Sequence, residues 1–263
     1  MKSSLDDCSK GPYGTPFGAW DVSGVTDMSG IFAATSFNAD VSKWDVSRVT
    51  GMNAMFASAT SFNGDLSQWD VSSVTDMSLM FGFTSFNGDL SKWDVSSVQR
   101  MSQMFFHATS FNADVSKWDV SCVTYMDGMF DSATSFNGDL SRWDVSRVSD
   151  MSLMFAFTSF NGDLSQWDVS RVTKMDDMFA SATSFNGDLS RWDVSRVQSM
   201  IRMFKGASSF KQRLCGETWV NSKATKDNMF TGSLGSISFT VCGAWCIGIL
   251  ILFHFSPQHN RAL

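Results

Sequence analysis

The sequence predicts a solenoid, an elongated domain in which similar units stack along one axis. Trp-Asp-Val-Ser occurs eight times, beginning at Trp20, Trp44, Trp69, Trp93, Trp118, Trp143, Trp167 and Trp192. Successive Trp residues lie 24 or 25 positions apart, and the extra residue of the longer units always falls just before Thr-Ser-Phe. A length change confined to one point is typical of a surface loop. The units therefore share one backbone path.

Each unit contains two different apolar periods. Trp69 and Val71 are two positions apart, which is the period of a strand with one buried face. Met77, Met80 and Phe81 follow the i, i+3, i+4 spacing of a helical face. We therefore expect an α/β solenoid, a leucine-rich-repeat-like right-handed coil of 24–25-residue repeats with one short parallel strand and one short helix or 3-10 turn per repeat. A β-solenoid without regular helices is the alternative.

The apolar residues of the template predict the core. One unit cannot bury its own apolar side chains, whereas stacked units bury them in columns. The residues expected in these columns are Trp44, Trp69, Trp93, Trp118, Trp143, Trp167, Trp192, Met77 and Phe81. We assign these residues no role in binding a ligand.

The chain divides into five segments. We expect an N-terminal cap over residues 1–19, a repeat solenoid of about eight coils over 20–214, and a degenerate C-terminal capping repeat over 215–236. A hydrophobic segment over 237–255 and a polar tail over 256–263 follow. Residues 44–117 and 118–191 match closely at an offset of 74, which indicates that the solenoid grew by duplication of three coils.

The repeat resembles that of a known family. The spacing of Leu66, Trp69, Val71, Val74 and Met77 follows the leucine-rich-repeat form, with Val in the Asn position. WDVSSVTDMSLMF, with the Thr-Ser-Phe loop after it, resembles the BspA-like leucine-rich-repeat surface proteins, and CGETWVNSKATKDNMFTGS at 215–233 resembles their closing repeat. The resemblance implies a surface protein engaged in adhesion and protein binding. It implies no catalytic activity and no defined site residues.

Composition argues against several classes of function. The net charge is −6 at pH 7, whereas nucleic-acid binders normally carry a basic stripe. The three histidines, His107, His254 and His259, form no constellation with Ser, Cys or Asp that predicts an enzyme. The five cysteines show neither zinc spacing nor a disulfide framework, and Cys8 and Cys215 are expected at opposite ends of the stack. We therefore expect no catalytic residues and no cofactor.

Two columns of aspartate raise the question of calcium. One runs from Asp40 and Asp65 onwards, and the other follows each Trp, as at Asp45 and Asp70. Stacked carboxylates repel one another, so calcium between the coils is possible. We favour structural pairing instead: Lys or Arg two positions before the Asp, as in Lys43 and Asp45, offsets one column, and the other column caps backbone amides of turns. We therefore predict no metal site.

Arginines predict an edge that binds a partner. The position after Val-Ser carries Arg147, Arg171 and Arg196 in three consecutive coils, and Arg142 and Arg191 lie in the same half of the chain. A basic stripe suits an acidic protein, an anionic glycan or lipid headgroups, although a solvated face is the simpler interpretation.

The apolar stretch near the C-terminus predicts contact with a membrane. Ile237 to Phe255 comprises 19 residues without Asp, Glu, Lys or Arg, about the length of one membrane span. A hydrophobic C-terminal cap is the alternative. We expect a protein anchored in a membrane or at the cell surface. No export signal is visible at the start, which suggests a truncated N-terminus.

The expected function is a non-catalytic, surface-displayed scaffold for adhesion that binds a protein or glycan. A structural protein that self-associates in a cell envelope or extracellular layer is the alternative. Regular Thr-Ser pairs, such as Thr60-Ser61 and Thr84-Ser85, suggest ice or mineral binding as a weaker alternative. We do not expect the protein to bind nucleic acid. The sequence does not indicate an oligomeric state.

Overall fold

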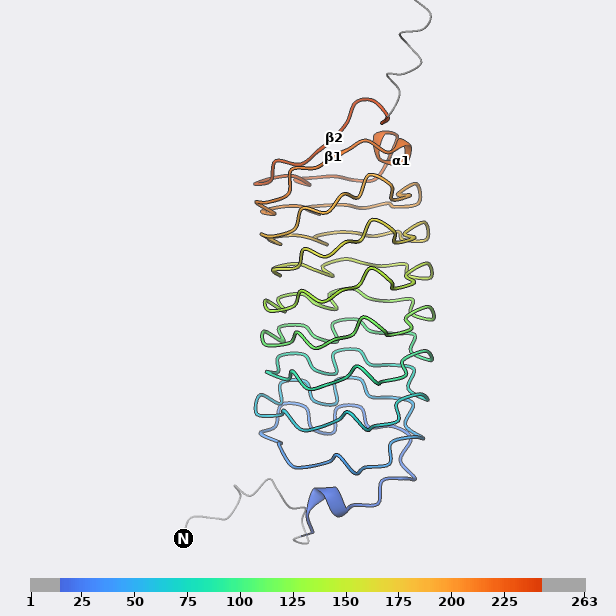
Figure 1. Ribbon diagram of the computed structural model, residues 1–263, viewed down its shortest axis with the longest axis vertical. Coiled ribbons are helices and arrows are strands. Elements are labelled where there is room, and N and C mark those ends of the chain that lie inside the picture. The colour runs from blue at the N-terminus through green and yellow to red at the C-terminus, as the bar shows by residue number, and fades with distance from the viewer. Residues whose placement is uncertain (1–14, 243–263) are drawn as a thin grey trace, which may run out of the picture.

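The structure, a computed structural model, describes residues 15–242 as coils stacked along the long axis (Figure 1). Parallel bridges join each coil to the next at one equivalent residue. The bridged residues are Asp27, Gly51, Asp76, Arg100, Tyr125, Asp150, Lys174, Ser199 and Thr225. The predicted repeat solenoid is therefore present.

Regular elements are few and lie at the two ends (Figure 1). The described part of the chain contains the 3-10 helix η1 (Phe17–Ala19), strand β1 (Arg213–Leu214), helix α1 (Glu217–Val220) and strand β2 (Ser236–Ile237). Strands β1 and β2 form a parallel pair. The expectation of one strand and one helix or 3-10 turn in every coil is wrong for the coils described, which resemble the alternative without regular helices.

Turns replace the strand expected around Trp69 and Val71. Trp69 N–H donates to Leu66 O at 3.1 Å, and Val74 N–H donates to Val71 O at 2.9 Å. Each turn is held by an aspartate, as in Asp70, whose Oδ1 accepts from the backbone N–H and the hydroxyl of Ser72. These local bonds use amides that a ladder between coils would need, so no strand forms. Trp69 and Val71 nevertheless point inward, as predicted.

Alternating hydrogen bonds replace the helix expected over Met77–Phe81. Met77, Leu79 and Phe81 donate their N–H groups to carbonyls of the next coil at 2.9–3.0 Å. Met80 N–H, between them, donates to Met77 O at 3.2 Å. An α-helix needs consecutive i to i−4 bonds, which this alternation excludes. We call this part of each coil, together with its equivalents, the ladder.

Columns of aromatic side chains fill the interior. The predicted core residues Trp44, Trp69, Trp93, Trp118, Trp143, Trp167, Trp192, Met77 and Phe81 are all buried. The Phe81 ring stacks on Phe56 and Phe105 of the adjacent coils, with centroids 5.8 and 5.7 Å away. A buried aromatic residue removes roughly 150–250 Å² from water, so this stacking dominates the stability of the fold.

Each buried indole also ties two coils together. Trp93 Nε1 donates to Leu66 O at 2.9 Å, and Trp118 Nε1 donates to Leu90 O at 3.0 Å. A buried N–H without an acceptor would cost about 1–3 kcal/mol, so this bond makes Trp suitable for the interior. Within the described residues, no buried side-chain nitrogen or oxygen lacks a partner.

Asparagines form a further column on the outside. Asn63 N–H donates to Asn38 Oδ1 and Asn87 N–H donates to Asn63 Oδ1, each at 3.2 Å. The same bond continues coil by coil until Lys211 N–H donates to Asn186 Oδ1 at 3.1 Å. The Asn-Gly-Asp segments are therefore inter-coil links as well as turns.

Short caps cover part of each end of the stack. Trp44 Nε1 donates to Phe17 O at 2.8 Å, which holds η1 against the first coil. At the other end β2 pairs with β1, and a disulfide joins Cys215 to Cys242. The expectation of no disulfide is therefore wrong. Cys8 and Cys215 are expected at opposite ends of the stack, but the partner of Cys215 is Cys242, which lies beside it at the C-terminal end.

The first residues of the hydrophobic segment belong to the C-terminal cap. Ser238 N–H donates to Leu214 O, and Cys242 N–H donates to Cys215 O, each at 2.8 Å. Residues 237–242, the first six of the expected membrane span, thus lie against the last coils. The rest of that span, 243–255, lies outside the described residues, as do the tail 256–263 and most of the expected N-terminal cap. From residue 15 to residue 242, no helix is long and apolar enough to cross a membrane.

Candidate functional site: the variable face of the ladder

Side chains that differ from coil to coil gather on the ladder, in three columns that we call the variable face. The first column contains the bridged residues, from Asp27 to Thr225. The second reads Gly30, Ala54, Leu79, Gln103, Gly128, Leu153, Asp177, Arg202 and Asn228. The third reads Ala34, Ser58, Phe83, His107, Ser132, Phe157, Ser181, Gly206 and Gly232. The Trp-Asp-Val-Ser segments, by contrast, are nearly constant.

Left-handed backbone shapes this face. Every residue of the second and third columns has a positive φ, between 51° and 80°. Such a conformation is uncommon outside glycine and costs roughly 1–2 kcal/mol for residues such as Leu79 and Phe83. The bond from each of their N–H groups to the next coil holds the conformation in place. The backbone thus fixes the position of the side chain whatever its identity.

Aromatic side chains stand out in the middle of the variable face. Phe83, Tyr125 and Phe157 are 45%, 44% and 53% exposed. The Phe83 ring stacks on His107 of the next coil, with centroids 5.2 Å apart, and meets Phe106 edge to face at 4.9 Å. Exposed aromatic residues on a rigid support are typical anchors for a binding partner.

Charged side chains on this face pair between coils. Arg100 lies 3.6 Å from Asp76 and 5.9 Å from the Tyr125 ring centre. Lys174 lies 3.7 Å from Asp150. Arg202 donates from Nε and Nη2 to the two carboxylate oxygens of Asp177, at 2.9 and 2.7 Å, and these bonds raise the pKa of Arg202. These are the ion pairs within the described residues. The pairs expected two positions apart, such as Lys43 with Asp45, are not among them.

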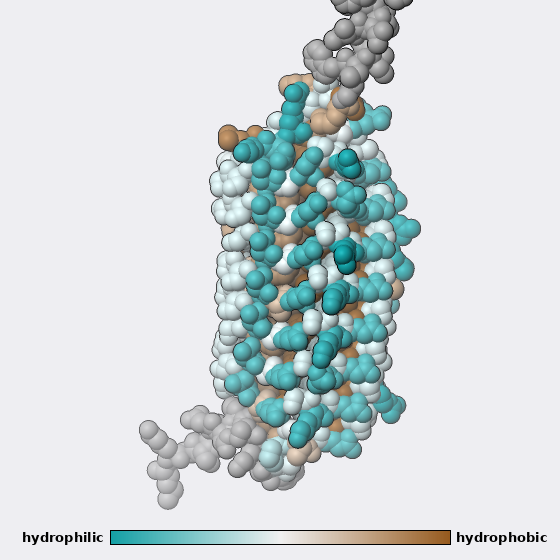
Figure 2. All heavy atoms as spheres, in the orientation of Figure 1, coloured by the Kyte–Doolittle hydropathy of each residue, from teal (hydrophilic) through white to brown (hydrophobic). Residues whose placement is uncertain are grey.

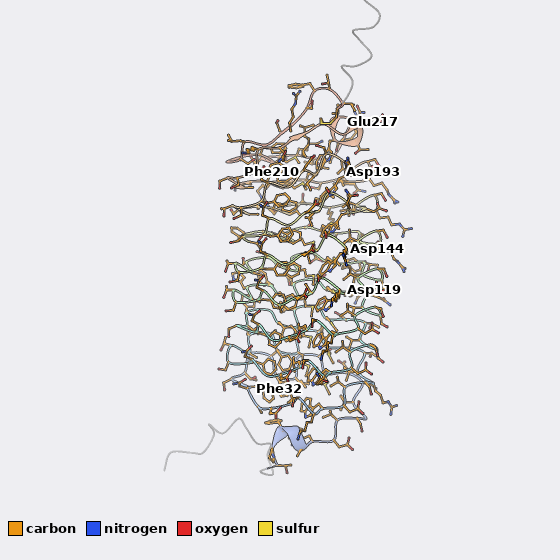
Figure 3. The ribbon with its side chains drawn as sticks, viewed as in Figure 1. Phe32, Asp119, Asp144, Asp193, Phe210 and Glu217 are labelled. Atoms are coloured by element: carbon orange, nitrogen blue, oxygen red, sulfur yellow. A yellow bond between two sulfur atoms is a disulfide. The ribbon has the colours of Figure 1, made fainter. Side chains whose placement is uncertain are left out.

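Both aspartate columns cap turns. Hydrogen bonds from the hydroxyl and the backbone N–H of Ser47 lower the pKa of Asp45. In the other column, bonds from the backbone N–H and the hydroxyl of Ser67 lower the pKa of Asp65. The capping role predicted for the column of Asp40 and Asp65 is therefore confirmed. The column of Asp45 and Asp70 has the same role. Asp119, Asp144 and Asp193 can be followed along the stack in Figure 3.

The structure shows no cluster of metal ligands in residues 15–242. No group of three or more His, Cys, Asp or Glu side chains is close enough to hold an ion. Each carboxylate of the two columns is directed at the serine two positions later in its own coil, as in the bond from Ser42 N–H to Asp40 Oδ1 at 2.9 Å. The arrangement therefore offers calcium no shared carboxylates.

The predicted arginine edge lies outside the ladder. Arg147, Arg171 and Arg196 occupy the same exposed turn of three successive coils, between the two valines of each repeat. Arg142 and Arg191 occupy the exposed turn before the tryptophan. Polar side chains form long columns on the surface shown in Figure 2. The structure thus brings the first three arginines into one column, and their role in binding stays a prediction.

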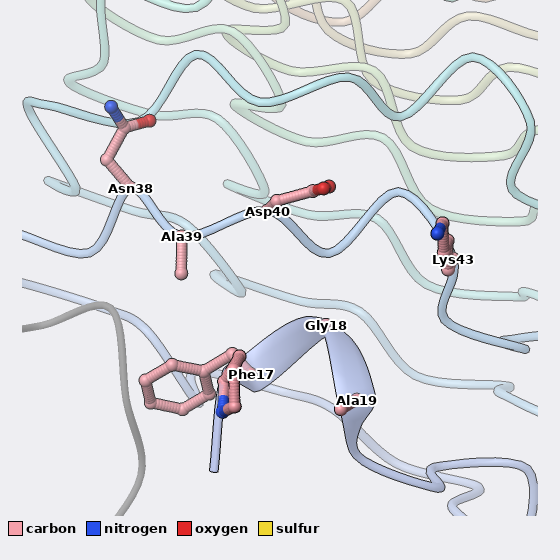
Figure 4. Close-up of a pocket in the computed structure, with 8 residues that line it drawn as sticks. Phe17, Gly18, Ala19, Asn38, Ala39, Asp40 and Lys43 are labelled. Carbon is pink, nitrogen blue, oxygen red and sulfur yellow. The ribbon is translucent and has the colours of Figure 1, made fainter. Parts of the chain in front are cut away.

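A pocket of about 530 Å³ lies between η1 and the first coil (Figure 4). Its lining is made of Pro16, Phe17, Gly18, Ala19, Asn38, Ala39, Asp40 and Lys43. Asp40, the carboxylate in the lining, already accepts from Ser42 N–H. The pocket is a gap beneath the cap, and its lining brings together no set of groups suited to catalysis.

The Thr-Ser pairs do not form one exposed array. Thr84 is buried and donates its hydroxyl hydrogen bond to Phe81 O at 2.7 Å. Thr158 is also buried and makes the equivalent bond to Phe155 O. Thr60 is exposed. A regular surface of hydroxyl groups, which the ice-binding alternative requires, is thus interrupted at these coils.

The sequence identified part of the variable face. The length change before Thr-Ser-Phe predicts a surface loop between Phe81 and Phe86, and this loop contains Phe83. The columns of Asp76 and Leu79 are not evident from the sequence, because the spacing of Met77, Met80 and Phe81 predicts a helix there. Variation among aligned copies of the repeat indicates these columns, since Asp76, Arg100 and Tyr125 occupy one position of the repeat.

The fold and this face define a tandem-repeat solenoid with a constant core and one variable face. A family model described as "Mycoplasma protein of unknown function, DUF285" matches residues 1–87, 82–159 and 156–238 in tandem. The chain therefore belongs to this family. No curated protein matches the chain.

Proposed function

We propose that this protein is a non-catalytic repeat scaffold that binds a protein or glycan at a cell surface, through the variable face. The observation that carries the proposal is that the ladder, where side chains differ from coil to coil, holds exposed aromatic residues on a hydrogen-bonded backbone. A rigid support reduces the entropy lost on binding. The resemblance to BspA-like leucine-rich-repeat proteins supports the same function.

Display outside the cytoplasm is part of the proposal. The disulfide between Cys215 and Cys242 supports it, because such bonds persist mainly in oxidising compartments. Anchoring by residues 237–255 stays a prediction. With residues 237–242 in the cap, 13 residues of the apolar run remain, fewer than the roughly 20 that one membrane span requires.

The test replaces the aromatic residues with residues that the same columns already contain. Other coils carry serine at the positions of Phe83 and Phe157 (Ser58, Ser132, Ser181) and of Tyr125 (Ser199). We therefore expect the triple variant F83S/Y125S/F157S to fold like the wild type. Its binding to fixed host cells and to a glycan array should fall about a hundredfold or more, since three anchors at roughly 1–2 kcal/mol each together contribute roughly 3–6 kcal/mol.

The matched control changes the arginine edge. R147S/R171S/R196S removes three exposed cations from turns outside the ladder. If the variable face is the binding site, this variant keeps its affinity. Equal binding by the wild type and the aromatic variant would contradict the proposal. A loss confined to the arginine variant, with a flatter dependence on salt, would assign binding to the arginine edge instead.

A further inference from the structure

The ladder is open at both ends of the described stack. In inner coils, carbonyls at alternate ladder positions accept hydrogen bonds from N–H groups of the preceding coil. For example, Met52 N–H donates to Asp76 O at 3.0 Å. Within residues 15–242, the equivalent carbonyls of the first coil receive no backbone donor. These carbonyls, which we call the N-edge, belong to Asp27, Ser29, Ile31 and Ala33. A row of such groups is a template for a further chain.

The last coil presents the complementary groups. In inner coils, alternate N–H groups donate to the coil that follows, as from Leu79 N–H to Ser102 O at 2.9 Å. In the described part of the chain, the equivalent amides of the last coil donate to no backbone carbonyl. These amides, which we call the C-edge, belong to Lys226, Asn228, Phe230 and Gly232. The carbonyls of the N-edge and the amides of the C-edge thus have the same spacing and complementary polarity.

Among residues 15–242, the caps leave these edges uncovered. Helix η1 lies against the segment around Trp44, and β2 with the disulfide covers Arg213–Cys215. Both segments lie on the part of the coil that contains the Trp-Asp-Val-Ser turns. The caps stand at opposite ends of the stack (Figure 1), so one molecule cannot join its own two edges.

Exposed apolar side chains gather near the same two ends. Trp20 and Ile31, in the first coil, are 39% and 46% exposed. Leu234 and Phe239, after the last bridge, are 79% and 97% exposed. Burial of such side chains would add to the hydrogen bonds of a junction.

We infer that a second copy of this chain stacks head to tail on the first, with the C-edge of one copy bonded to the N-edge of the next. The register follows from that of the inner coils. Lys226, Asn228, Phe230 and Gly232 N–H groups donate to the carbonyls of Asp27, Ser29, Ile31 and Ala33 of the next copy, respectively. Because this contact is heterologous, it repeats and forms an open fibre. The variable face continues across each junction, so a fibre presents the proposed binding surface many times. The inference does not depend on the identity of the ligand.

The test uses one pair of side chains that only a junction brings together. Ser29 and Asp227 occupy the same position of the first and last coils and are both exposed. At about 4.8 Å per coil they lie tens of ångströms apart within one molecule, but about 4.8 Å apart across a junction. S29D should weaken association at least fivefold, the ratio that corresponds to ~1 kcal/mol of repulsion. The double variant S29D/D227K should restore it.

The measurement is sedimentation velocity of the full chain over a range of concentrations, with electron microscopy of the largest species. Particles that lengthen along the stack axis at constant width, weakened by S29D and rescued by S29D/D227K, are the expected result. S73D is the matched control in an inner coil, at a turn outside the ladder, and should leave association unchanged. A wild-type chain that stays monomeric at all concentrations, or association that S29D does not alter, would overturn the inference. So would protection of the Lys226, Asn228, Phe230 and Gly232 amides from hydrogen exchange in the monomer, since the chain itself would then cover the C-edge.

Discussion

At the scale of single residues, polar side chains of the repeat make the same hydrogen bond in coil after coil. From Trp69 onwards each Trp indole donates to the preceding coil, and each turn aspartate accepts from the serine two positions later, as Asp45 does from Ser47. The pKa values of Asp45 and Asp65 are lowered, so the contribution of each to stability is present above its unfolded pKa of about 3.9 and is lost as pH falls through the folded value. These two turns therefore contribute stability at neutral pH and lose it in acid.

Asp131 has the opposite dependence on pH. It is buried on the ladder, and burial raises its pKa, although a bond from the Ser132 hydroxyl and the nearby His107 oppose this shift. A carboxyl group with a raised folded pKa contributes stability below its unfolded pKa and loses that contribution as pH rises through the folded value. We expect D131N, which keeps the oxygen that accepts from Ser132, to increase the free energy of unfolding at pH 7. The difference from the wild type should shrink at pH 3.

The measurement is urea denaturation followed by tryptophan fluorescence at both values of pH. D45N is the control at a turn aspartate and should lower stability at pH 7. A D131N variant that is less stable than the wild type at pH 7 would contradict the assignment of burial as the dominant effect.

At the scale of elements, the chain gains its order from turns and inter-coil bonds. Whether each side chain points inward or outward was predictable, because Trp69, Val71, Met77 and Phe81 follow a simple apolar pattern. The type of element was not. The apolar pattern reports burial, whereas the choice between helix and turn depends on where each N–H finds its acceptor. Met77 N–H donates to the next coil, and the sequence of one repeat contains no sign of this.

The site was predictable only in part for a related reason. The left-handed columns contain Leu79, Gln103 and Phe83, residues that do not signal a positive φ. Only Gly30, Gly128, Gly206 and Gly232 would have suggested it. The disulfide was missed because Cys242 lies in an apolar stretch that was assigned to a membrane. A return of this stretch to Cys215 depends on the pairing of β1 with β2, which is too short to recognise from sequence.

The C-terminal cap depends on that disulfide. Cys215 and Cys242 are separated by 27 residues, and closing a loop of this size in the unfolded chain is worth roughly 3–4 kcal/mol in the entropic account. We expect C215S to lower the stability of the last coils by up to about that amount. C122S, which removes a free thiol at a half-buried position, should have little effect. Denaturation with and without a reductant tests this, and a wild-type protein that is indifferent to reduction would contradict it.

At the scale of the whole molecule, stability is a sum over neighbouring coils. A solenoid has no contacts between distant repeats, so whole coils can be removed if the register is kept. Deletion of residues 118–191 joins Lys117 to Trp192 and restores the Lys-Trp-Asp-Val sequence of other repeats. We expect a folded protein that is shorter by about 14 Å, the rise of three coils at about 4.8 Å each.

Small-angle scattering measures the maximum dimension, and tryptophan fluorescence confirms the buried indoles. Deletion of residues 118–178 is the control, because it joins Lys117 to Phe179 out of register and should prevent folding of the joined coils. An in-register deletion that is as disordered as this control would show that the fold needs contacts beyond adjacent coils.

The direction of the ladder bonds has a mechanical consequence. They connect each coil to the next along the stack, as from Phe81 N–H to Met104 O, so a pull on the two ends loads the bonds between one pair of coils in tension. Terminal coils, which have a neighbour on one side, would then peel away before inner ones. Each coil that opens releases 24 or 25 residues, about 80 Å of extended chain. A tether built in this way lengthens in steps under tension, and the remaining coils stay folded.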